Sequence, residues 1–123
     1  MKLPSFNLLI VEDQEYIRNN IKAEAVKTKV FDSIFLCSTV KEAREIIANE
    51  EIQIISLDLS LPDGSGLEIL AYLKENNIDK KVIVFSASPE MESVSKRYGA
   101  YEFFDKKNGI EPLINGLKNY IQV

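Results

Sequence analysis

The chain has 123 residues, of which 46% are hydrophobic and 28% are charged, and a formal net charge of −4. This length suits one domain with its own core, expected over residues 1–123, and the composition excludes a largely disordered chain. The 15 basic residues form no stripe, so we expect no direct binding of nucleic acid. No apolar stretch approaches the roughly 18 residues that span a bilayer, so we expect no membrane partner. Cys37 is the one cysteine, which excludes an internal disulfide and fits a cytoplasmic location.

The first half of the chain alternates strand-like and helix-like segments. A short apolar strand is predicted over residues 8–11. Apolar residues then recur at every fourth position, as on one face of a helix: Ile17, Ile21 and Ala25. A second strand is predicted over residues 33–38. Thr39 follows it with Glu42 three residues later, a capping-box pattern that predicts the start of a second helix.

The third strand is predicted over residues 52–57. It is almost continuously apolar, as expected of a strand that helices cover on both faces. Ser65 and Glu68 repeat the capping-box pattern and predict the next helix. A fourth, strongly hydrophobic strand is predicted over residues 82–85.

The last part of the chain completes the alternation. A short helix is predicted over residues 89–98, ending at Gly99, because glycine is common just after a helix C-terminus. A brief edge strand over residues 102–104 and a final helix over residues 110–121 follow. Strict alternation of strands and helices predicts an α/β fold, with a parallel sheet between two layers of helices.

Polar side chains stand at or just beyond the ends of four predicted strands. Glu12 and Asp13 close the first strand, Asp58 the third and Ser86 the fourth, while Lys106 follows the fifth within two residues. The carboxyl ends of the strands of an open parallel sheet share one edge, where functional groups collect. We therefore expect three acids, a hydroxyl and an amine to meet there.

Three clustered carboxylates need a cation, since each pair repels by about 4 kcal/mol at 4 Å with an effective dielectric near 20. Mg²⁺ is the expected cofactor, because it binds through a few carboxylates and leaves room for phosphate oxygens. Asp58 is then a candidate nucleophile that accepts a phosphoryl group. Lys106 would neutralise the charge in transfer, and Ser86 would donate a hydrogen bond to the modified carboxylate. We expect Glu12, Asp13, Asp58 and the backbone carbonyl of Ser60 to hold the metal.

This pattern resembles the receiver domain of two-component response regulators, in the CheY-like superfamily. The resemblance covers residues 8–121 and rests on the segments LLIVED, LDLSLPDGSG, VIVFSAS and GAYEFFDKK. It implies a flavodoxin-like (βα)5 sandwich with strand order 2-1-3-4-5. It also implies a signalling phosphoacceptor that is not an enzyme, in which a histidine kinase or phosphotransfer protein phosphorylates Asp58. The chain has no histidine, so the donor must be another molecule or domain.

The resemblance further implies a switch. Ser86 would move toward the phosphoryl group and Phe103 would follow it, although Phe103 also fits a plain core position. The face formed by the helix at 89–98, the strand at 102–104 and the last helix would respond, signalling to an output domain, a target protein or a second copy in a homodimer. Ser60 and Ser88 occupy the positions that tune the lifetime of the acyl phosphate.

The chain departs from the family pattern in two places. Lys107 replaces the proline that usually follows the lysine with a cis peptide, and a non-proline cis bond costs about 2.5–4 kcal/mol, so we expect a trans bond. The stretch from Ser86 to Gly99 is a residue or two shorter than in the family pattern, so the resemblance does not fix the residue at which its helix begins.

Two other functions remain as alternatives. A degenerate receiver that serves only as a docking module would need none of the five site residues that are present. A phosphatase with an aspartyl phosphate would need an acid two residues after the nucleophile, where this chain has Ser60. Labelling by acetyl phosphate separates these functions.

Overall fold

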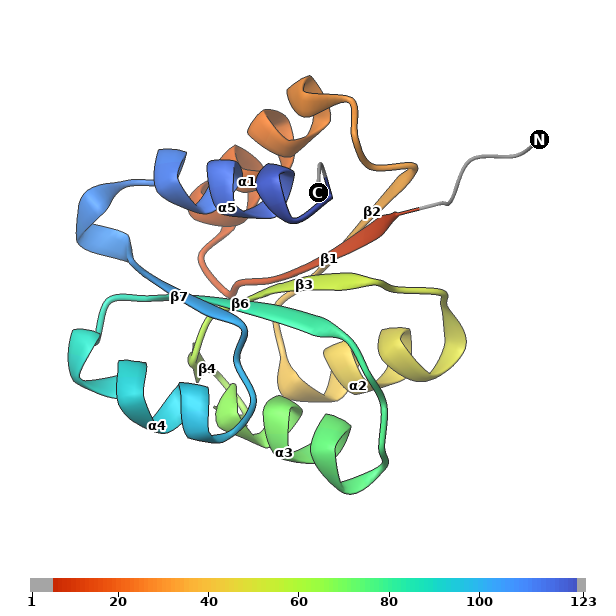
Figure 1. Cartoon of the computed structure of the whole chain (residues 1–123), viewed down its shortest axis with the longest axis vertical. Helices are drawn as coiled ribbons and strands as arrows, with labels where there is room; N and C mark the ends of the chain where they lie inside the picture. The colour runs from red at the N-terminus through yellow and green to blue at the C-terminus, as the bar shows by residue number, and fades with distance from the viewer. Residues whose placement is uncertain (1–5, 122–123) are drawn as a thin grey trace.

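The structure is a computed structural model that describes residues 6–121. Its centre is a five-stranded sheet of the strands β1 (Asn7–Val11), β2 (Ser33–Cys37), β3 (Ile54–Leu57), β6 (Lys81–Ser86) and β7 (Glu102–Asp105). The order is β2-β1-β3-β6-β7, and every neighbouring pair is parallel (Figure 1). Counted among the sheet strands alone, this is the predicted order 2-1-3-4-5, which is confirmed.

Helices cover both faces of the sheet and make three layers (Figure 1). One face carries α1 (Glu15–Thr28) and α5 (Glu111–Ile121). The other carries α2 (Val40–Asn49), α3 (Leu67–Glu75) and α4 (Glu92–Arg97). The predicted flavodoxin-like sandwich is therefore confirmed.

Two hydrophobic cores follow from the alternation of side chains along each strand. In β1, Leu8 and Ile10 pack toward α1 and α5, while Leu9 and Val11 pack toward α2 and α3. A central strand of such a sheet needs apolar residues at consecutive positions, because each face meets a layer of helices. This explains the uninterrupted apolar runs in the sequence.

Thr39 caps α2 as predicted, whereas Ser65 is not the N-cap of α3 but the residue before it, because the N-cap is Gly66. The hydroxyl oxygen of Thr39 accepts a hydrogen bond from the Glu42 amide at 3.1 Å, at the start of α2. At the start of α3, Ser65 Oγ accepts from the Leu67 amide at 3.1 Å, and Glu68 accepts from the Ser65 amide at 2.9 Å. These local hydrogen bonds lie at the helix N-termini that the sequence predicts, to within one residue.

The structure differs from expectation in two loops. Ser60–Leu61 (β4) and Gly64–Ser65 (β5) pair as a small antiparallel hairpin that the sequence pattern did not predict. The helix predicted over residues 89–98 is divided into a 3₁₀ turn, η1 (Pro89–Met91), and the short α4. Gly99 follows α4 with a φ of 108°, as expected of a C-terminal glycine.

No helix within residues 6–121 is both long enough and apolar enough to cross a membrane.

Candidate functional site

Three carboxylates meet at the carboxyl edge of the sheet. Glu12, Asp13 and Asp58 each place one carboxylate oxygen within 4.8 Å of the others. The sheet positions them, because the Asp58 amide donates to the Val11 carbonyl at 2.9 Å and so continues the β1–β3 ladder. Glu12 and Asp58 are 1% and 4% exposed, whereas Asp13 is exposed. The predicted acid cluster is therefore present, with two buried members and one at the solvent side.

Lys106 joins the two buried acids. Its Nζ lies 2.9 Å from Glu12 Oε1 and 3.3 Å from Asp58 Oδ2. The residue begins a 3₁₀ turn, η2 (Lys106–Asn108), which Asp105 caps by accepting from the Lys107 amide at 2.9 Å. The Lys106–Lys107 peptide is trans, as predicted, and the lysine still reaches the cluster.

Burial changes the acidity of Glu12. Removal from water, reinforced by the negative charge of Asp58, raises the pKa of Glu12 to about 7, although hydrogen bonds from Lys106 and from the Gln14 amide act in the opposite direction. The ammonium group of Lys106 contacts both buried carboxylates of a cluster that contains three. An added divalent cation would favour the charged form of Glu12, because an opposite charge nearby lowers the pKa of a carboxyl group.

Both oxygens of the Asp58 carboxylate have partners. Oδ1 accepts a hydrogen bond from the Ser60 amide at 3.2 Å, and Oδ2 accepts one from Lys106 at 3.3 Å. A carboxylate held in this way presents a fixed oxygen to an incoming electrophile. The main chain after β3 and the loop after β7 together set its orientation.

The predicted switch residues lie on the neighbouring strands β6 and β7. Ser86 is buried at the end of β6, and its Oγ accepts from the Ser88 amide at 3.1 Å. Within residues 6–121, no hydrogen bond joins Ser86 to Asp58 in this structure. Phe103 is half-buried opposite Val84 and packs against the core on the α2 and α3 side. In this conformation it occupies the core-facing position that the sequence left as an alternative.

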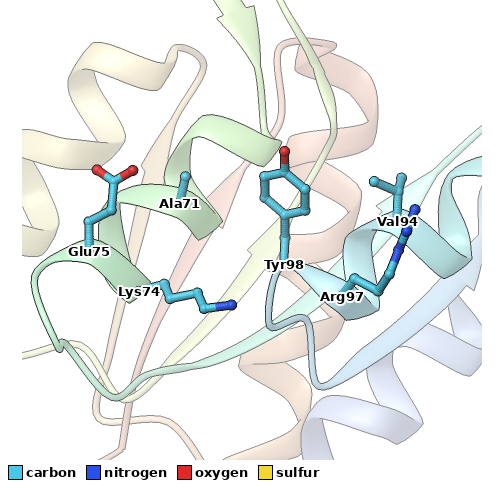
Figure 2. A pocket seen from close by; sticks show the side chains of 6 residues that line it. All are labelled: Ala71, Lys74, Glu75, Val94, Arg97 and Tyr98. Atoms are coloured by element: carbon cyan, nitrogen blue, oxygen red, sulfur yellow. The ribbon is translucent and has the colours of Figure 1, made fainter.

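A surface groove lies away from the predicted site residues. It is between α3 and α4, has a volume of about 470 Å³ and is lined by Ala71, Lys74, Glu75, Val94, Arg97 and Tyr98 (Figure 2). None of these residues is one of the predicted site residues. The chemistry is therefore expected at the sheet edge and not in this groove.

One residue near the site had no role in the sequence analysis. Asp63, in the hairpin after Asp58, accepts hydrogen bonds from the amides of Val40 at 2.8 Å and Lys41 at 3.0 Å. These two amide hydrogen bonds lower the pKa of Asp63. Its position between Pro62 and Gly64 indicates a turn, but nothing local in the sequence indicates a partner 23 residues away.

The chain is similar in sequence to known proteins. Residues 8–118 match the family described as the response regulator receiver domain. The chain is 32% identical to the transcriptional regulatory protein MalR of Bacillus subtilis, over 93% of this chain and 49% of MalR. It is 30% identical to sporulation initiation phosphotransferase F of Bacillus subtilis, over 93% of this chain and 92% of that protein. It thus spans about half the length of the first relative and nearly all of the second.

A solved structure agrees in fold. The solution structure of the beryllofluoride-activated NtrC4 receiver domain dimer has a TM-score of 0.81 and 28% identity, over 94% of this chain and 96% of that one. The matches in sequence and in fold support one conclusion. The chain belongs to the response regulator receiver domain family.

Proposed function

We propose that the chain accepts a phosphoryl group on Asp58 from a phosphohistidine of another molecule or domain. One observation carries this proposal: Asp58 lies among Glu12, Asp13 and Lys106, with Lys106 Nζ 3.3 Å from its Oδ2. In the reaction, a carboxylate oxygen of Asp58 forms a bond to phosphorus while the phosphorus–nitrogen bond of the donor breaks. The imidazole is the leaving group. Lys106 would offset the charge on the phosphoryl oxygens during transfer.

The acid cluster fits a hard divalent cation, because its donors are carboxylate oxygens within 4.8 Å of one another. We propose that Glu12, Asp13, Asp58 and the Ser60 carbonyl hold Mg²⁺. When bound, the ion would supply positive charge to the phosphoryl oxygens. Glu12 would be deprotonated in this state, since a metal ligand must be in its charged form.

The proposed switch uses the residues beside Asp58. Ser86 would exchange its hydrogen bond from the Ser88 amide for one to the phosphoryl group, and Phe103 would move with the end of β6. The resulting conformational change would reach the surface formed by α4, β7 and α5. Ser60 and Ser88 flank the site and would set how readily water reaches the acyl phosphate.

The proposed partners are a histidine kinase or a phosphotransfer protein as donor, and an output domain or target protein as receiver of the signal. MalR is named as a transcriptional regulatory protein, which supports an output domain as the receiver of the signal. Phosphotransferase F is named as a phosphotransferase, which supports a partner in phosphoryl transfer. The activated NtrC4 receiver domain is a dimer, which supports a phosphorylation-dependent homodimer as one form of output.

The test is labelling with acetyl phosphate and Mg²⁺, followed by intact-mass measurement. The wild type should gain one phosphoryl group that hydroxylamine removes, and Asp58→Asn should gain none. The matched control is Asp79→Asn, which changes an exposed acid before the amino end of β6 and should label like the wild type. Labelling of Asp58→Asn would refute the assignment. Steady hydrolysis of a phosphomonoester would indicate the phosphatase, and neither activity would indicate the docking module.

A further inference from the structure

We propose that Asp63 is a positioning residue for the phosphorylation site. Its carboxylate would hold the hairpin after Asp58 against the N-terminus of α2 and thereby orient Ser60 toward the metal and the phosphoacceptor. This inference rests on the proposed function, because it assigns Asp63 a role in the same site.

The N-terminus of α2 is capped from two places in the chain. Thr39 satisfies one amide of the first turn, because its hydroxyl accepts from Glu42 at 3.1 Å, while its carbonyl accepts the first regular hydrogen bond of the helix, from Ala43 at 3.1 Å. Asp63 satisfies the two amides that precede Glu42, on Val40 and Lys41. The first four amides of a helix have no partners inside it, so the distant Asp63 adds to a cap that the local sequence supplies only in part.

The hairpin needs such an anchor. Its strands β4 and β5 have two residues each, and an isolated two-stranded hairpin is at best marginally stable in water. Asp63 is at its exposed tip, where the carboxylate makes two charge-assisted hydrogen bonds to α2. The positive end of the helix dipole favours the same arrangement.

The other end of the hairpin is joined to the phosphoacceptor. The Ser60 amide donates to Asp58 Oδ1 at 3.2 Å, and the Gly66 amide donates to the Leu59 carbonyl at 2.9 Å. The hairpin is therefore fixed at its base by Asp58 and Leu59 and at its tip by α2. Release of the tip would let Ser60 rotate, and Ser60 offers both an amide to Asp58 and a carbonyl to the proposed metal.

This geometry predicts a measurable effect on metal binding. Loss of a group that holds a metal ligand in place typically weakens affinity by roughly 10–100-fold. Asp63 acts on Ser60 indirectly, through the two residues between them. We therefore expect Asp63→Ala to weaken Mg²⁺ binding by about 3–10-fold, less than the loss of a direct contact would. Asp63→Asn keeps one acceptor oxygen and should lie between Asp63→Ala and the wild type.

Thr39→Ala is the matched control, because it removes the local side-chain hydrogen bond of the same helix cap, to the Glu42 amide, and changes no residue of the hairpin. Both substitutions should lower the melting temperature, but only Asp63→Ala should weaken Mg²⁺ binding in an NMR titration of the full chain. Equal affinity in Asp63→Ala and the wild type would overturn the proposal. An equal loss in Thr39→Ala would overturn it too, since it would show that the effect comes from α2 alone.

Amide hydrogen exchange in the metal-free protein gives a second measurement that does not depend on phosphorylation or metal. The Ser60 and Gly66 amides should exchange faster in Asp63→Ala than in the wild type and be unchanged in Thr39→Ala. Unchanged exchange in Asp63→Ala would refute the anchoring of the hairpin. If the wild type binds no Mg²⁺, the proposed metal site is wrong, and so is the proposed effect of Asp63 on metal binding. The exchange measurement still decides whether Asp63 orders the hairpin.

Discussion

Glu12 shows how burial alters a single residue of the site. In the folded chain its pKa is raised to about 7 from an ordinary value of 4.5, mainly because the carboxyl group is removed from water. Between these two values the folded chain holds a proton that the unfolded chain has released. The free energy of unfolding that Glu12 contributes must therefore fall as the pH rises from 4.5 toward 7.

Glu12→Gln should remove this pH dependence. Each unit of pKa shift corresponds to about 1.4 kcal/mol, so between pH 4.5 and 8 the variant should gain up to about 3 kcal/mol relative to the wild type. The measurement is urea unfolding of both proteins at several pH values in that interval, with EDTA present to exclude metal. Parallel curves for the two proteins would contradict the assignment. Glu15→Gln, at an exposed acid three residues away, should leave the pH dependence unchanged.

At the scale of elements, α3 begins unusually close to the phosphoacceptor strand. A Cβ at Gly66 would lie 2.4 Å from the Asp58 carbonyl oxygen and 2.9 Å from the Leu59 Cα. Both neighbours are backbone atoms and cannot rotate away. Glycine at this position therefore allows the helix to start directly against the end of β3, next to the site.

Gly66→Ala should destabilise the fold by about 1–3 kcal/mol, the usual cost of forcing an extra carbon into a packed site. Gly116→Ala in α5 is the matched control. There the new Cβ would meet ring atoms of Phe104, a half-buried side chain that can shift, and alanine favours a helix by up to about 1 kcal/mol over glycine. Urea unfolding should show a larger loss for Gly66→Ala, and equal losses would contradict this account.

At the scale of the whole molecule, the site exists only when the chain is folded. Lys106 is 94 residues from Glu12 and 48 from Asp58, yet it contacts both. A ligand of such a site binds the folded state alone and must stabilise the entire sheet. The repulsion among the carboxylates makes a cation the natural stabiliser.

Mg²⁺ should therefore raise the free energy of unfolding of the wild type, by about 2.7 kcal/mol at a concentration 100 times the dissociation constant. Asp13→Ala removes the exposed acid of the proposed metal site and should lose most of this gain in stability, whereas Asp79→Asn should keep it. Chemical unfolding with and without Mg²⁺ measures the effect. A gain of the same size in Asp13→Ala, or none in the wild type, would exclude the proposed metal site.

Local sequence was enough to predict most of the fold. Apolar periodicity located the five sheet strands and most of the helices, because each period reflects the side-chain geometry of one element. The Thr39 cap was also predictable, as was a local hydrogen bond between Ser65 and Glu68, since each partner lies three residues away. The meeting of Glu12, Asp13, Asp58 and Lys106 followed from the rule that parallel strands share a carboxyl edge.

Only the tertiary structure decided the features that depend on distant partners. The amides that Asp63 binds are 22 and 23 residues away in α2, and the hairpin it anchors is too short to show a period. The raised pKa of Glu12 depends on its burial and on the negative charge of Asp58, which is on another strand. Sequence patterns describe neighbours along the chain, whereas desolvation and these hydrogen bonds arise between elements that meet only after the sheet has formed.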